Sequence, residues 1–306
     1  ARRPLLLDAA MGTRLLARGL DLTREDPCLW CLDRPDEVLD IHRRDIAAGS
    51  DALLTNTFGA NRITLARLGY QGEVIAINRR AVALAREAAG PDRFVLGSIG
   101  PQAAYDTAAT REQVLALAEA GVDALFLETH TGHAAQRRLH DLHGLTDRPI
   151  LVALSQWGDM ARPNQQTVSS LGGYPRFGRD DGVSAFGSNC LIGMEETLRV
   201  TKWLRGRVDV PLIAKPSAGL PHQPALSSQR SALGSQLSAI SSLRVKPSAG
   251  HPLASPASFA AAVPRLLAFG VRLFGGCCGT TEAHIAALRA ALDQLPGSAG
   301  VSGEDS

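Results

Sequence analysis

The sequence has few of the features that direct a protein to a membrane, a nucleic acid or an oxidising compartment. No apolar run in its 306 residues approaches the ~20 residues of a membrane-spanning helix, and the apolar stretch after the first arginines is too short for a signal peptide. The net charge is only +2, so no strong field favours nucleic acid or an anionic membrane. The five cysteines are an odd number and two are adjacent, which argues against a secreted disulfide framework. These absences predict a cytoplasmic protein that contacts neither nucleic acid nor membrane.

Short apolar runs alternate with longer helical patterns along a chain that is 45% hydrophobic and 20% charged. The runs that we interpret as strands are residues 5–10, 52–58, 94–100, 124–129, 149–155, 183–189, 210–215 and 271–275. Helical patterns cover residues 11–18, 37–48, 73–89, 111–120 and 133–143. Uninterrupted apolar strands between helices are typical of a parallel sheet buried on both faces. Eight such units predict an α/β fold, a single-domain (β/α)₈ TIM barrel, with a doubly wound sheet as the alternative.

Two segments depart from this alternation. Residues 157–181, after the fifth strand, are rich in Gly, Pro, Asn and Arg and carry no helical pattern. Residues 221–250, after the seventh strand, form a serine-rich, low-complexity insert. The sequence Lys-Pro-Ser-Ala-Gly occurs at 215–219 and again at 246–250. We therefore assign residues 1–296 to the barrel, with irregular loops after strands five and seven, and residues 297–306 to a flexible tail.

Three cysteines are predicted to meet at one rim of the barrel. Cys277 and Cys278 follow the eighth strand within Phe-Gly-Gly-Cys-Cys-Gly-Thr-Thr, and Cys190 follows the sixth. The carboxyl ends of barrel strands share one face, where catalytic residues gather. Three thiolates leave one position of a tetrahedral Zn²⁺ open, as in catalytic zinc sites. The alternative is that these are small buried core residues, but two adjacent cysteines between glycines at a strand end favour the metal site.

Cys28 and Cys31 form a second pair, Cys-Leu-Trp-Cys. Their spacing suits a redox motif or half of a zinc site. However, the pair follows the first helix rather than lying in a thioredoxin-like βαβ unit, and no second pair of ligands accompanies it. We expect both cysteines to pack beside Trp30.

Seven motifs, spread in order over nearly the whole chain, resemble those of one enzyme family. They are Asp8-Ala-Ala-Met-Gly-Thr13, Thr55-Asn-Thr-Phe-Gly-Ala-Asn61, Gly97-Ser-Ile-Gly-Pro101, Glu128-Thr129, Gly187-Ser-Asn-Cys190, Lys215-Pro-Ser-Ala-Gly219 and Gly275-Gly-Cys-Cys-Gly-Thr-Thr281. Together they resemble the homocysteine S-methyltransferase family, which includes betaine–homocysteine methyltransferase and the homocysteine-binding barrel of cobalamin-dependent methionine synthase. The family fold is a (β/α)₈ barrel. The resemblance implies that Cys190, Cys277 and Cys278 hold zinc and that homocysteine adds its sulfur as a further ligand.

The same resemblance suggests how homocysteine is held. It implies that Glu128 binds the amino group, although a carboxylate there could instead be an exposed helix cap. Asp8 is expected to orient the following loop, in which backbone N–H groups of Ala10 and Met11 can bind the carboxylate. Ala9 stands where the family has a glycine. Asn189 and Ser98 are expected to line the site, whereas His130 and His133, at an expected helix start, are expected to be solvated.

The expected function is zinc-dependent transfer of a methyl group to the thiolate of homocysteine, which forms methionine. The chain has no folate or cobalamin domain, so betaine or another small methyl donor is expected, with a separate corrinoid protein as the alternative source. The insert and the repeated motif keep open a zinc-binding barrel that is weakly active or inactive. A phosphate- or nucleotide-binding protein is disfavoured because the turn glycines lie in neither a P-loop nor a Gly-x-Gly-x-x-Gly motif. A homo-oligomer or a corrinoid protein stays open as the partner.

Overall fold

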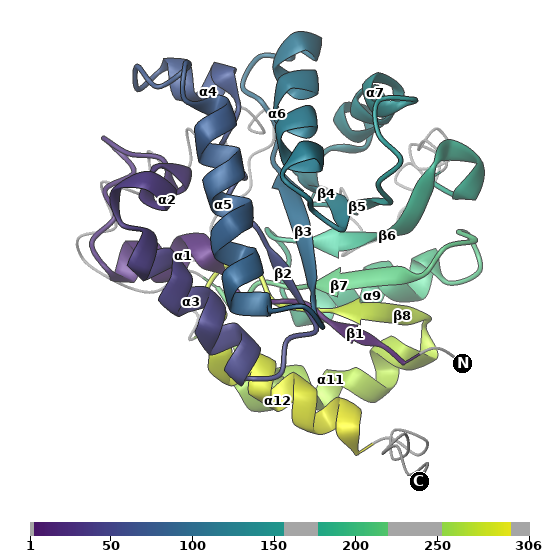
Figure 1. Ribbon diagram of the computed structural model, residues 1–306. Coiled ribbons are helices and arrows are strands. Elements are labelled where there is room, and N and C mark those ends of the chain that lie inside the picture. Colours follow the sequence, from purple (N-terminus) through teal and green to yellow (C-terminus); the bar gives the residue numbers. More distant parts are fainter. Residues whose placement is uncertain (1–2, 156–176, 220–252, 295–306) are drawn as a thin grey trace, which may run out of the picture.

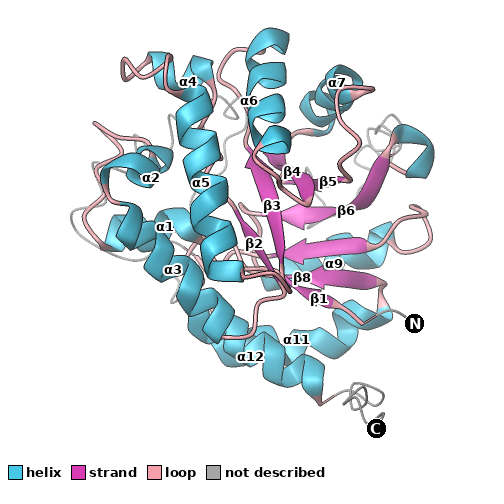
Figure 2. Ribbon diagram, viewed as in Figure 1, coloured by secondary structure: helices cyan, strands magenta, loops and turns pink. Residues whose placement is uncertain are grey.

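The computed structural model describes residues 3–155, 177–219 and 253–294. Its eight strands form one parallel sheet in the order β1-β8-β7-β6-β5-β4-β3-β2. The sheet curls into a nearly closed barrel with the helices on its outside (Figures 1 and 2). The strands are β1 (Leu5–Leu6), β2 (Ala52–Leu54), β3 (Phe94–Ile99), β4 (Ala124–His130), β5 (Ile150–Leu154), β6 (Val183–Asn189), β7 (Leu212–Lys215) and β8 (Val271–Phe274). The predicted (β/α)₈ barrel is confirmed, and the doubly wound sheet is excluded because β1 pairs with β8.

The helices alternate with the strands along the chain. They are α1 (Met11–Ala17), α2 (Trp30–Asp33), α3 (Pro35–Ala47), α4 (Arg62–Ala66), α5 (Val74–Ala89), α6 (Thr107–Glu119), α7 (Gly132–Leu142), α9 (Met194–Leu204), α11 (Pro256–Ala268) and α12 (Glu282–Asp293), with short 3₁₀ turns η1 (Pro27–Leu29) and η2 (Arg179–Asp181). Within the three described stretches, no helix is long and apolar enough to cross a membrane.

Apolar side chains on both faces of the sheet explain why the strands are apolar without interruption. One set fills the inside of the barrel, and a larger set packs between the sheet and the outer helices. In β2, for example, Ala52 and Leu54 belong to the inner set and Leu53 to the outer set. A strand buried on both sides shows no polar alternation.

Local signals in the sequence set the helix boundaries. Asp106 accepts a hydrogen bond from the Ala109 N–H and so caps α6, and Thr131 caps α7 in the same way. Sequence patterns did not indicate α9, α11 or α12. In α9 the inward face includes Thr197 and Thr201, which a search for apolar periodicity does not count.

The closure between β1 and β2 combines one backbone hydrogen bond with two bonds to side-chain carboxylates, without a regular ladder. The Asp51 N–H donates to the Leu6 carbonyl over 2.7 Å, and the Leu6 N–H donates to the Asp51 carboxylate over 2.8 Å. Two residues beyond β1, the Asp8 carboxylate accepts the Leu54 N–H over 2.7 Å. Asp8 therefore joins the two strands at the carboxyl end of the barrel.

Most of the two segments predicted to be irregular, and the predicted tail, lie outside the described residues. The described end of the first segment contains η2. The second copy of Lys-Pro-Ser-Ala-Gly, at 246–250, also falls outside them. The first copy begins at Lys215, the last residue of β7.

Candidate metal and substrate site

A cavity opens at the carboxyl ends of the strands. It is lined by side chains from nearly every part of the rim. The polar and sulfur-containing side chains among them are Asp8, Met11, Thr13, Asp26, Thr55, Asn56, Ser98, Glu128, Thr129, Cys190, Lys215, Cys277 and Cys278. All three cysteines that were predicted to meet at the rim therefore share one cavity with Glu128 and Asp8.

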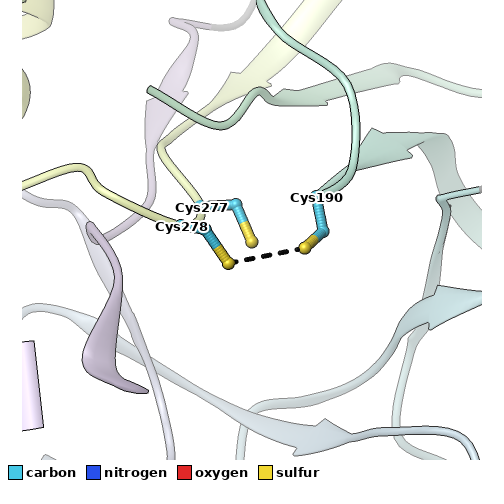
Figure 3. Close-up of side chains that lie close together, drawn as sticks. All are labelled: Cys190, Cys277 and Cys278. Atoms are coloured by element: carbon cyan, nitrogen blue, oxygen red, sulfur yellow. Dashed lines mark hydrogen bonds between the residues drawn. The ribbon is translucent and has the colours of Figure 1, made fainter. Parts of the chain in front are cut away.

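The three thiols lie close enough to hold one metal ion. Their sulfur atoms are all within 4.8 Å of one another, and the Sγ atoms of Cys190 and Cys278 are 3.6 Å apart (Figure 3). Tetrahedral zinc with Zn–S bonds of ~2.3 Å requires ligand sulfurs about 3.8 Å apart, so the spacing fits. Contact with Cys190, together with burial, raises the pKa of Cys277 well above its usual value. Three thiols this close can ionise together only around a cation.

Backbone hydrogen bonds attach both cysteine loops to the end of β7. The Cys277 N–H donates to the Pro216 carbonyl and the Cys190 N–H to the Lys215 carbonyl. Gly279, which follows the double cysteine, has φ +79°, and a Cβ there would lie 2.0 Å from the Gly219 carbonyl oxygen. Only glycine suits that position. The loop is therefore shaped so that both of its thiols face Cys190 (Figure 3).

Glu128 is a buried acceptor in the cavity wall rather than an exposed helix cap. It is 9% exposed. The Ser98 hydroxyl donates to Oε1, and the Asn189 amide donates to Oε2 over 3.4 Å. Desolvation raises the pKa of Glu128, while Lys215 opposes that shift. A cationic group of a ligand would offset the cost of this burial.

Lys215 is a site residue that the sequence analysis did not single out. Its Nζ lies 2.8 Å from Asp8 Oδ1, and both side chains are almost fully buried. Burial lowers the pKa of Lys215, but Asp8 and Glu128 outweigh that effect and raise it. The ammonium group therefore remains charged between the two carboxylates.

Asn189 lies behind the cavity wall and is not one of its lining residues. Its Oδ1 accepts from the Thr129 N–H over 2.9 Å, and its Nδ2 donates to the Thr129 hydroxyl over 2.8 Å. Thr129 has φ +63°, a left-handed conformation that is uncommon for a residue other than glycine. Asn189 holds that conformation and, through it, the end of β4 that carries Glu128.

Ala10 and Met11 both line the cavity at the start of α1. The Ala10 N–H already donates to the Thr280 hydroxyl over 3.1 Å, and that hydroxyl donates to the Cys277 carbonyl over 2.7 Å. Met11 is therefore the first residue of α1 whose N–H could meet a carboxylate. The same bonds tie the start of α1 to the double-cysteine loop.

Two expectations about residues outside the site have different outcomes. Cys28 and Cys31 are free and buried, and Cys31 packs in one cluster with Trp30, as expected. Cys28 packs instead with Leu29, Ala60 and Leu65. The expectation that His130 is solvated is wrong, because β4 extends one residue further than predicted and buries the ring completely. Its Nδ1 lies 2.9 Å from the Glu128 carbonyl oxygen, and burial lowers its pKa to about 3. His133 is exposed, as expected.

Fold and site together define a (β/α)₈ barrel with a three-cysteine cluster and buried charged groups at its catalytic face. Residues 5–292 match the family model described as homocysteine S-methyltransferase. The chain is 30% identical to the homocysteine S-methyltransferase of Escherichia coli K12, and the match covers 94% of each protein. The metallated form of the E. coli homocysteine methyltransferase MmuM aligns with a TM-score of 0.68 and 26% identity, over 94% of this chain and 96% of that one.

Methionine synthase of Mycobacterium tuberculosis is also 30% identical, over 96% of this chain. The chain spans only about a quarter of the length of the two mycobacterial methionine synthases that it matches. This chain belongs to the homocysteine S-methyltransferase family.

Proposed function

We propose that the protein transfers a methyl group from a small donor to the sulfur of homocysteine, with Zn²⁺ held by Cys190, Cys277 and Cys278. The observation that carries this proposal is the convergence of three sulfur atoms, all within 4.8 Å of one another, on a cavity that also contains Glu128 and the Asp8–Lys215 pair. A thiol coordinated to Zn²⁺ loses its proton and stays available as a nucleophile.

The chain's own residues would orient the amino acid part of homocysteine. Glu128 would accept hydrogen bonds from the amino group, because it is a buried carboxylate in the cavity wall whose hydrogen-bond donors, Ser98 and Asn189, are neutral. The Met11 N–H, at the start of α1, would donate to the carboxylate. Lys215 limits the repulsion between that carboxylate and Asp8. This placement directs the homocysteine sulfur toward the three cysteines.

Metal content and X-ray absorption at the zinc edge test this proposal. We expect about one zinc per chain, and one additional sulfur neighbour when homocysteine is added. Cys277→Ala should lose both zinc and methyl transfer. Cys28→Ala removes a buried free thiol outside the cluster and should keep the zinc. Full activity of the metal-free protein would overturn the proposal.

A donor screen separates the proposal from its alternatives. Methyl transfer from betaine or another small donor supports it directly. Transfer only from a methylated corrinoid protein would replace the donor and leave the thiol half of the mechanism intact. Zinc and homocysteine binding without transfer from any donor would indicate an inactive barrel.

A further inference from the structure

The described residues that line the cavity carry more negative than positive charge. The described lining residues include three acidic ones, Asp8, Asp26 and Glu128, and one basic one, Lys215. Asp8 pairs with Lys215, and Lys215 also acts on Glu128. Asp26 is the third acidic lining residue, and it takes no part in these interactions with Lys215.

The carboxylate of Asp26 is buried without a cationic partner. Asp26 is 4% exposed, and its Oδ1 accepts the Cys28 N–H over 3.0 Å. No Lys or Arg of the described stretches comes within ion-pair distance of it, and Arg67 acts on it only from further away. Desolvation raises the pKa of Asp26, so burial here costs free energy unless a cation lies nearby.

The other carboxylate oxygen occupies space that a side chain would normally fill. A Cβ at Gly59 would lie 2.3 Å from Asp26 Oδ2, so only a residue without a side chain leaves room for the carboxylate. Gly59 and Asp26 both line the cavity. The chain therefore keeps a negative group in the wall beside the Phe58–Gly59 segment.

Apolar residues also line this cavity. Phe58, next to Gly59 in the chain, lines the cavity and is 36% exposed, and Leu16, Leu22 and Pro27 are further lining residues. The face of an aromatic ring attracts cations, and apolar side chains accept methyl groups without loss of hydrogen bonds. A carboxylate, an aromatic ring and aliphatic side chains together suit a cation that is covered by methyl groups.

Resting on the proposed function, we propose that Asp26 and Phe58 form the subsite for the positively charged centre of the methyl donor, a sulfonium or a quaternary ammonium group. In the transfer, the homocysteine thiolate forms a new S–C bond to the methyl carbon. The C–S or C–N bond of the donor breaks, and its electron pair stays on the departing sulfur or nitrogen. The donor leaves as a neutral thioether or amine.

This chemistry predicts how Asp26 affects the kinetics. The positive charge is complete in the bound donor, partly lost in the transition state and absent from the product. Asp26 therefore stabilises the bound donor at least as much as the transition state, so its charge should lower KM rather than raise kcat. A residue with only a structural role would not produce this separation of KM from kcat.

The test is the variant Asp26→Asn of the zinc-loaded protein. Asn caps a helix as well as Asp does, so the turn at η1 is retained while the charge is removed. Asp106→Asn is the matched control, because Asp106 caps α6 in the same way and does not line the cavity. Binding of S-methylmethionine and of betaine is measured by calorimetry without homocysteine, so that no turnover is required.

We expect Asp26→Asn to weaken binding of the preferred cation about tenfold or more, with kcat little changed, and Asp106→Asn to change neither. Neutral isosteres, homoleucine for the sulfonium and 3,3-dimethylbutanoate for the ammonium, should bind the wild type weakly and show no effect of the variant. Which cation responds identifies the donor class. Absence of cation binding to the wild type, or equal affinities in wild type and Asp26→Asn, overturns the inference. Cation binding that depends on Asp26 but is not followed by methyl transfer would instead refute the proposed function.

Discussion

Replacement of Lys215 by methionine should destabilise the barrel far more than loss of a surface charge. Lys215 Nζ and Asp8 Oδ1 are 2.8 Å apart, with side chains only 3% and 4% exposed. Removal of one partner leaves the other charge buried, which costs about 3–5 kcal/mol. Asp8 cannot turn to solvent without losing its 2.7 Å bond from the Leu54 N–H, which joins β1 to β2. We therefore expect Lys215→Met to lower the free energy of unfolding by about 3–5 kcal/mol.

Urea denaturation at neutral pH measures this loss. The control is Arg43→Met, which removes the ion pair between Arg43 and Glu87, whose side chains are 61% and 51% exposed. Exposed pairs of this kind contribute at most about 1 kcal/mol. The double variant Lys215→Met/Asp8→Asn removes both charges and should regain part of the stability. A loss below about 1 kcal/mol, or a loss equally large in the Asp8→Asn background, would refute the reasoning.

The remaining predictions concern pH and backbone conformation. Burial lowers the pKa of His42 to about 4, so the unfolded chain binds this proton more tightly, and stability falls as pH drops from 6.5 toward 4. Relative to His42→Leu, urea unfolding should show the wild type losing about 2 kcal/mol between pH 7 and pH 4.5; a constant difference would contradict this. Gly279→Ala should weaken zinc binding at least about tenfold, because its Cβ would collide with the Gly219 carbonyl and displace Cys278. Gly121→Ala, at φ +91° with nothing within 4 Å, should leave zinc affinity unchanged, and equal affinities of both variants would disprove the steric argument.

The strands could be predicted from the sequence because burial on both faces makes each of them a continuous apolar run. Seven of the eight predicted runs contain the whole observed strand. The exception is β4, which extends one residue beyond its run to His130. The meeting of Cys190 with Cys277 and Cys278 followed from the rule that strand ends share one face. Neither inference required a distance between side chains.

The charged partners could not be found in this way. Lys215 and Asp8 are 207 residues apart, and a lysine that ends an apolar strand gives no signal of the carboxylate that it meets. Asn189 was expected to line the site, yet its amide is used to hold Thr129 and Glu128 in place. Asp26 lies outside the seven motifs, and its relation to the cavity depends on how Gly59 packs against it.

Asp8 shows why stability and substrate binding are coupled in this barrel. One carboxylate oxygen completes the junction of β1 with β2, and the other holds Lys215 in the cavity wall. The peptide group of Lys215 in turn accepts the N–H of Cys190. A change that frees Asp8 would therefore open the barrel seam, release the ammonium group and loosen one of the three thiols. Substitutions in this chain of contacts should reduce stability and zinc affinity together, whereas Asp26→Asn should alter donor binding alone.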